Sequence, residues 1–169
     1  MKMEKAMLKT YILVSLLMVP VTFSHYVSAA PGDVKFSGTL IEPPPCTFND
    51  GSPILVDFGT AVMTHRVDGS NYAKPINYNL VCTTPPLNTM RIKVQGTAST
   101  FDTKVLRTAE KTDLGIAITA DNKALPINTW LNFNNPASPK MQAVPVKKSG
   151  ATLTGGSFTA TATMQVDYQ

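Results

Sequence analysis

The side chains that could perform chemistry in this chain are few, and two cysteines lead them. Cys46 and Cys82 are the only cysteines among the 169 residues, and their spacing excludes a C-x-x-C redox motif. A thiol pair can form a disulfide or supply part of a zinc site. Zinc would need two further ligands, and His65 is the only histidine beyond the N-terminal segment. The sequence therefore predicts no metal site.

No other set of residues assembles an enzyme site. A catalytic triad cannot be built around His65 alone, so we interpret this histidine as a surface residue in a loop. The sequence contains no glycine-rich loop that could cradle a phosphate. Trp130 lies in an apolar stretch with Leu131 and Phe133, and we expect it in the core rather than as a sugar-binding platform. The sequence thus predicts no catalytic residue, no cofactor and no small-molecule substrate.

The N-terminus has the features of a cleavable export signal. Three lysines lie within the first nine residues, and residues 11–23 are mostly apolar but too short and interrupted for a membrane span. Small residues follow up to Ala29, so we expect a signal peptide at residues 1–29.

An exported chain with one pair of cysteines most simply forms one disulfide, which contributes roughly 3–4 kcal/mol in the chain-entropy model.

The exported part of the chain has the size of one domain, about 140 residues. Loss of three lysines and one glutamate with the signal would lower the net charge from +4 to about +2. This charge is too small to indicate binding to nucleic acid.

The pattern beyond the signal is typical of an all-β protein. Apolar residues alternate with polar ones in short stretches, separated by turns rich in glycine, proline, asparagine and aspartate. The stretches lie at residues 54–58, 76–82, 90–94, 114–118, 125–133 and 143–146. Thirteen prolines leave room only for a short helical turn near residues 108–113. This arrangement favours a sandwich or a barrel.

The last fourteen residues carry the longest alternation. Apolar side chains occupy every second position: Phe158, Ala160, Ala162, Met164, Val166 and Tyr168. The alternation predicts a final strand that begins after Gly155-Gly156 and has one buried face. No hairpin partner follows it, and an exposed edge of this length favours pairing with another chain.

A second alternating stretch lies near the start of the exported chain. Its apolar and glycine positions are Val34, Phe36, Gly38 and Leu40. Three prolines at residues 43–45 follow as a stiff spacer without backbone donors. The pattern alone is equally consistent with the first strand of the domain and with an arm held away from the domain.

In this order along the chain, these features resemble the subunits of chaperone–usher pili, the fimbrial family of Gram-negative bacteria. The resemblance covers the exported chain and begins with the alternating arm and the cysteine pair. It continues through Val56-Asp57-Phe58-Gly59, Asp68-Gly69-Ser70-Asn71-Tyr72, Pro75-Ile76-Asn77-Tyr78 and Leu114-Gly115-Ile116. Gly156, fourteenth from the end, and the penultimate Tyr168 match the C-terminal signature of the family. The proline run is longer than the family pattern, which bears on how freely the arm swings.

The resemblance implies an incomplete immunoglobulin-like sandwich of six strands, whose seventh strand is supplied in trans. Residues 30–45 would be a flexible donor-strand extension, and residues 46–169 would be the pilin domain. A periplasmic chaperone would lend a strand to the groove beside the C-terminal strand. At the outer-membrane usher, the extension of a neighbouring subunit would replace it. The protein would then be a structural subunit, exported through the periplasm to the cell-surface fimbrium.

The same resemblance assigns roles to residues. The donor strand would comprise Val34, Phe36, Gly38 and Leu40. The acceptor groove and chaperone contact would comprise Gly156, Phe158, Ala160, Ala162, Met164, Val166, Tyr168 and Gln169. Gly38 is expected to enter a shallow part of the partner's groove, with a simple bend in the strand as the alternative.

Three roles stay open at this stage. The residues around 68–72 favour a minor or adaptor pilin of a tip fibre in cell adhesion, and the chain is too short to add a receptor-binding domain. One alternative is the subunit that terminates the pilus and cannot accept another arm. The other is a self-contained secreted carbohydrate-binding sandwich, which would fold alone.

Overall fold

The computed structural model describes residues 34–40, 42, 46–83 and 88–169. The chain divides into two units, Met1–Thr39 and Leu40–Gln169. In the first unit, residues 34–39 have no regular secondary structure, and the side chains of Val34 and Phe36 are exposed. The expected signal peptide and the proline spacer lie outside the described residues, so the proposed division at residues 29 and 45 stays a prediction.

The second unit is built from short strands, as the alternation predicted. The strands are β1 (Cys46–Phe48), β2 (Lys74–Ile76), β3 (Leu80–Cys82), β4 (Thr89–Gly96), β5 (Leu106–Arg107), β6 (Leu114–Ala120), β7 (Lys123–Leu125), β8 (Leu131–Asn134), β9 (Met141–Lys147) and β10 (Ala162–Tyr168). Two single-turn 3-10 helices, η1 (Asn49–Gly51) and η2 (Thr64–Arg66), complete the described elements, and the second carries the exposed His65. Within the described residues, no helix has the length and apolar character of a membrane span.

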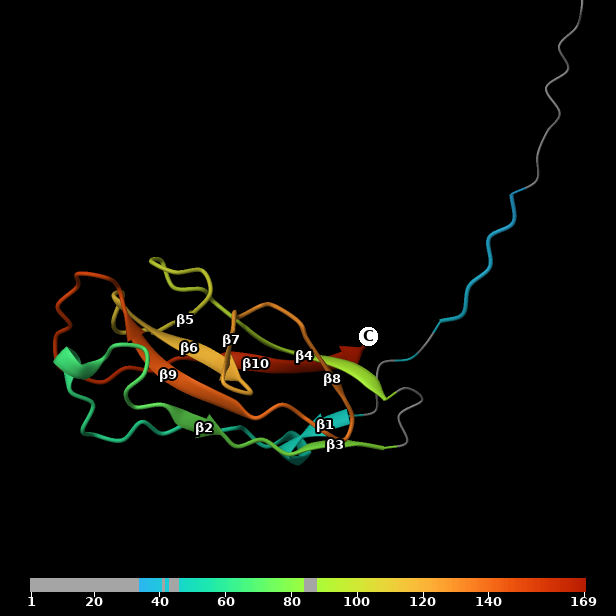
Figure 1. The fold of residues 1–169 in the computed structure, drawn as a ribbon, viewed down its shortest axis with the longest axis horizontal. Coiled ribbons are helices and arrows are strands. Elements are labelled where there is room, and N and C mark those ends of the chain that lie inside the picture. Colours follow the sequence, from blue (N-terminus) through green and yellow to red (C-terminus); the bar gives the residue numbers. More distant parts are fainter. Residues whose placement is uncertain (1–33, 41, 43–45, 84–87) are drawn as a thin grey trace, which may run out of the picture. The chain divides into compact units, whose positions relative to one another are not determined.

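The strands form two larger sheets and a small one, all antiparallel. One sheet has the order β2-β9-β6-β5, with β7 also paired to β6, and the other has the order β10-β4-β8 (Figure 1). Ile92 and Val94 of β4 belong to the same buried cluster as Ile116 and Ile118 of β6. The two sheets therefore enclose one common core, which is the sandwich expected from the sequence.

Alternation along β4 shows how the sequence builds this core. Met90, Ile92 and Val94 are at most 3% exposed, whereas Arg91 and Lys93, which alternate with them, point to the outer face. The centre of the other sheet depends on a glycine. A Cβ at Gly115 of β6 would lie 2.8 Å from Cγ2 of Val105, closer than side chains approach one another. Glycine at this position lets β5 and the segment before it pack directly onto β6.

The predicted disulfide is confirmed. Cys46 of β1 lies opposite Cys82 of β3, and the bond between them joins the two strands of the small sheet.

The predicted turn at residues 68–71 is also present. Both Ser70 and Asn71 donate their backbone amides to Oδ1 of Asp68, the hydrogen-bond pattern that favours aspartate at the start of a turn.

The expected helical turn is not formed. Residues 108–113 form bends and turns rather than a helical turn. The reason is local, because the buried Thr108 hydroxyl donates to the carbonyl oxygens of Lys111 and Leu114, and side-chain bonds of this kind compete with helical ones.

Trp130 lies half-buried on the outer face of the β10-β4-β8 sheet rather than in the core. The guanidinium carbon of Arg91 is 4.7 Å from the centre of its ring system, and Nζ of Lys93 is 4.5 Å from it. Both cations occupy outward positions of β4, so the indole that contacts them is outside as well.

Candidate functional site

The first wall of the candidate site is an extended segment, residues 53–58. Ile54, Val56 and Phe58 are half-buried, while Leu55 and Asp57 between them are exposed. This is the alternation that predicted a strand. The segment has no ladder partner among the described residues, and so it does not form a strand. The strand expected at residues 54–58 is therefore not formed in the described chain, although its side chains keep the alternating burial.

The second wall is the first half of the C-terminal segment, residues 152–161. The final strand was expected to begin after Gly156, but β10 begins only at Ala162. Ala162 pairs with Gly96, which is the last residue of β4, so residues before Ala162 have no strand beside them in the described chain. The prediction of one continuous buried face is also wrong, because Ala160 and Ala162 are exposed and Phe158 is half-buried.

The core is incompletely covered beside β10. Met164, Val166 and Tyr168 lie directly opposite Val94, Ile92 and Met90 of β4, so the two sets share the inner face of the sheet. The β4 residues are at most 3% exposed, yet their three partners on β10 are only half-buried. In the sheet order, β10 pairs with β4 alone, and its other edge carries no ladder within the described residues. An inner face that is exposed at a free edge indicates a missing neighbour.

A cavity of about 570 Å³ lies between the two walls. Val56 and Phe58 line it from the first wall, and residues 153–158 line it from the second. Val67 and Leu114, both buried, form its apolar floor. The rings of Phe58 and Phe158 approach to 5.7 Å between centroids, so the two walls touch at one point. We call this cavity and the free inner face of β10 the acceptor groove.

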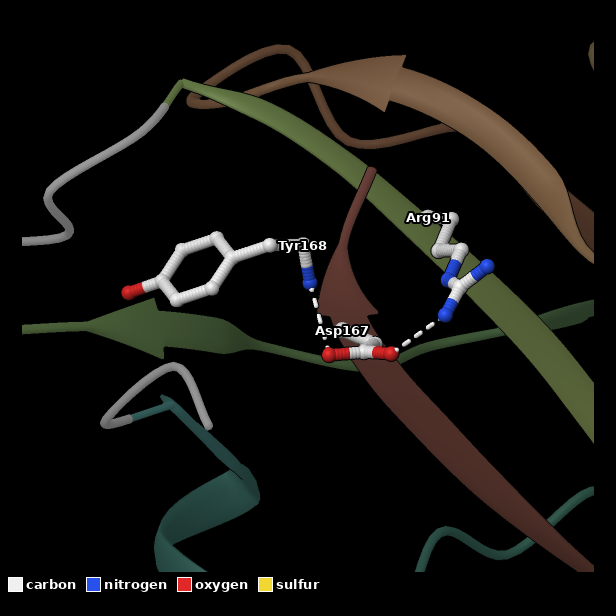
Figure 2. Close-up of polar contacts among 3 residues, drawn as sticks. All are labelled: Arg91, Asp167 and Tyr168. Atoms are coloured by element: carbon white, nitrogen blue, oxygen red, sulfur yellow. Dashed lines mark hydrogen bonds and ion pairs between the residues drawn. The ribbon is translucent and has the colours of Figure 1, made fainter. Parts of the chain in front are cut away.

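A polar contact secures the far end of β10. Arg91 Nη2 lies 2.7 Å from Oδ2 of Asp167, and Oδ1 of the same carboxylate accepts the backbone amide of Tyr168 (Figure 2). The amide of Gln169 donates to the carbonyl oxygen of Thr89, which extends the pairing with β4 by one residue. The Tyr168 ring points away from Arg91, and its hydroxyl has no hydrogen-bond partner in the described part of the chain.

The Arg91–Asp167 pair predicts a small acid-dependent change in stability. The hydrogen bond from Arg91 holds the pKa of Asp167 below its ordinary value of 3.8. The pair therefore stabilises the fold above that value and ceases to do so as the pH falls through the lower pKa of the folded state. Both side chains are more than one-third exposed, so the contribution is below about 1 kcal/mol. In urea unfolding, the Asp167→Asn variant should have the same free energy of unfolding as the unmodified protein at a pH below the folded-state pKa of Asp167. At pH 7 the free energy of unfolding of the variant should be lower. An equal loss at both pH values would contradict this assignment.

The structure does not bring together all residues that the sequence assigned to the site. Of the predicted acceptor residues, Gly156 and Phe158 line the cavity, and Met164, Val166 and Tyr168 form the free inner face. Ala160, Ala162 and Gln169 are exposed. The donor assignments stay predictions, with the side chains of Val34, Phe36 and Leu40 exposed. The sequence reasoning missed Val56 and Phe58 as groove residues, although their alternation had marked the segment as a strand.

An all-β sandwich with one uncovered edge is the fold of chaperone–usher pilus subunits, and comparison with solved structures agrees. The chain is 29% identical to the P pilus adaptor subunit PapF, with a TM-score of 0.55 over 76% of this chain and 98% of that chain. The P pilus rod subunit PapA shares the fold, with a TM-score of 0.60 at 20% identity over 74% of this chain and 99% of that chain. The incomplete immunoglobulin-like sandwich expected from the sequence is therefore confirmed.

Residues 34–169 match the family of fimbrial proteins, and the chain belongs to this family. A relative of similar length, the fimbrial-like protein YfcR of Escherichia coli, is 36% identical over 152 residues, which covers 88% of this chain and 87% of that protein. The protein is thus a structural pilus subunit at the cell surface that contacts neighbouring subunits, and it is not an enzyme. This membership leaves no support for a self-contained carbohydrate-binding module.

Proposed function

We propose that this protein is a minor or adaptor subunit of an adhesive pilus and that it polymerises by donor-strand exchange. The observation that carries the proposal is the acceptor groove. Two extended segments, residues 53–58 and 152–161, border one cavity, and each lacks a ladder partner among the described residues. A strand laid between them would supply what both edges lack. The similarity to PapF, an adaptor subunit, supports the adaptor role.

The physical gain from a donated strand has two parts. Backbone groups of the incoming strand would pair with the free edge of β10, each bond contributing about 1 kcal/mol net. Alternate side chains would cover the exposed inner face. Three apolar side chains of the size of Val34, Phe36 and Leu40 would contribute about 5–9 kcal/mol before the cost of ordering the strand.

The occupant that fits this groove is the N-terminal extension of a neighbouring subunit of the same class. In this chain the donor strand of that extension is residues 34–40, seven residues, the same length as β10. Its apolar side chains occur at every second position, which matches the repeat of a strand that buries one face. The chain therefore carries one donated strand and one groove that accepts another.

A subunit with an uncovered core needs temporary cover before assembly. An exposed apolar edge promotes aggregation, and a strand lent by a periplasmic chaperone would prevent it. Replacement of that strand at an outer-membrane usher would couple export to assembly. This scheme agrees with the signal peptide expected at residues 1–29 and would take the subunit through the periplasm. The open cavity favours a subunit that accepts an arm over one that terminates the pilus.

Substitution of Gly38 by leucine tests the donor role of the extension. Glycine within a strand permits close approach of another backbone, so a leucine should clash with the groove of the receiving subunit and slow exchange at least tenfold. The matched control is Ser37→Leu, which adds the same side chain on the opposite face of the extension. Exchange would be measured as displacement of the chaperone from the receiving subunit by synthetic extension peptides. Equal rates for the two peptides would remove the donor assignment of Gly38.

A further inference from the structure

The segment Thr154–Thr159 is held in place without a β-ladder. It precedes the first residue of β10 that pairs with β4. Backbone order at such a position requires other partners, because an extended segment with free amides and carbonyls is otherwise solvated and mobile. Those partners come from the turn at residues 109–111, which is more than forty residues away in the sequence.

Glu110 binds one end of the segment. Its two carboxylate oxygens accept the backbone amide of Thr159 at 2.6 Å and the hydroxyl of the same residue at 2.8 Å. The neighbouring amide of Ala109 donates to the Thr159 carbonyl oxygen at 2.9 Å. Both backbone groups of Thr159 are thereby satisfied by the turn. The side-chain and backbone hydrogen bonds from Thr159 also hold the pKa of Glu110 below its ordinary value, so the carboxylate is ionised at neutral pH.

Lys111 binds the other end. Its ammonium group donates to Oγ1 of Thr154 at 3.0 Å and to the carbonyl oxygen of Gly155 at 2.7 Å. The same atom lies 3.2 Å from the position that a Cβ on Gly156 would occupy. Gly156 has a φ of +123°, a conformation that favours glycine. The lysine therefore lies against Gly156, where the backbone of this segment makes a bend.

The segment fastened in this way is a wall of the acceptor groove. Lys111 and residues 153–158 line the same cavity, opposite Val56 and Phe58. The position of this wall sets the width of the cavity. An incoming side chain must fit within that width. A wall that moved would leave only a fraction of molecules with the groove in the accepting form, and that fraction would reduce the apparent affinity and the rate of strand uptake.

We propose that Glu110 and Lys111 form a brace that holds Thr154–Thr159 as a preformed wall and thereby sets the rate at which a donated strand is taken up. This inference rests on the proposed function, since it concerns acceptance of a strand. The two side chains are positioning residues, because their hydrogen bonds are made to residues of the wall, at Thr154, Gly155 and Thr159.

Two variants and two matched controls test the brace. Glu110→Ala and Lys111→Met remove its two halves. Asp113→Ala and Lys148→Met remove an exposed carboxylate and an exposed ammonium group that pair with each other at 3.8 Å, and neither side chain lines the cavity. Each full-length protein would be purified from the periplasm as its chaperone complex. The first measurement is amide hydrogen exchange of residues 154–159, and the second is the rate at which a synthetic peptide of residues 30–42 displaces the chaperone.

The brace predicts faster amide exchange at residues 154–159 and slower peptide uptake in the two brace variants, each by about three- to tenfold, as expected for loss of exposed charge-assisted bonds. The controls should match the unmodified protein in both measurements. Unchanged amide exchange in the brace variants, or uptake that is equal or faster, would overturn the inference. Failure of the unmodified protein to take up the peptide would instead count against the proposed function. The amide exchange would then still decide whether the turn holds the wall.

Discussion

Deletion of residues 30–41 is expected to abolish assembly of this subunit onto its neighbour while leaving its own fold intact. The fold should survive because the buried cluster consists entirely of residues between Ile92 and Ala143, with no member in the deleted segment. Assembly should fail because the deletion removes Val34, Phe36 and Leu40, whose burial would contribute about 5–9 kcal/mol to the contact between subunits. Loss of this contribution should reduce incorporation of the deleted subunit into fibres below detection.

The measurement is the formation of fibres that resist dissociation by detergent, with co-purification of the chaperone as the test of folding. A matched control replaces Lys35 and Thr39 by alanine, which alters the polar face of the extension and leaves its apolar face intact. The control should assemble normally. Fibres that contain the deleted subunit with neighbours on both sides would contradict the donor role of the extension.

Supplying the missing strand within the same chain is expected to yield a stable monomer. A copy of residues 34–40 would be joined after Gln169 through a short turn, so that it runs antiparallel to β10 along its free edge. The copy would cover the inner face at Met164, Val166 and Tyr168, which is half-buried in the chain as it stands. The protein should then accumulate without a chaperone. Burial of the three apolar side chains would contribute about 5–9 kcal/mol, and the entropy of ordering the copy would reduce this gain. The free energy of unfolding should therefore rise by several kcal/mol.

Size-exclusion chromatography and urea unfolding of the extended protein measure this effect. The control carries the same tail with serine in place of the copies of Phe36 and Leu40, which keeps the backbone groups and removes the apolar side chains. That control should aggregate or require the chaperone. A natural chain that is monomeric, soluble and as stable as the extended protein would show that no strand is missing.

Much of the fold could be predicted from local patterns. A strand repeats every two residues whatever its neighbours are, so the alternation through Met90, Ile92 and Val94 correctly predicted the buried face of β4. The disulfide followed from the count of cysteines in an exported chain. Turn chemistry at Asp68 was equally local, because the side chain binds amides only two and three residues away.

The limits of the groove depended on contacts that no local pattern contains. The final alternation extends back to Phe158, but a ladder needs a partner, and β4 ends at Gly96, opposite Ala162. Because β4 ends at Gly96, β10 can begin only at the residue opposite, Ala162. The same pattern also placed Trp130 in an apolar stretch without indicating that Arg91 and Lys93 would hold it on the outer face.

The amino-acid sequence by itself determined the class of fold, the cysteine pair, the free final strand and the family, because each is written in composition, spacing or a repeat of two. Only the tertiary structure decided that Val56 and Phe58 face Phe158 across one cavity and that Glu110 and Lys111 hold its wall. Those residues lie about fifty to a hundred positions from their partners. Contacts at such separation depend on how the sheets bring distant segments together, and that arrangement is a property of the whole chain.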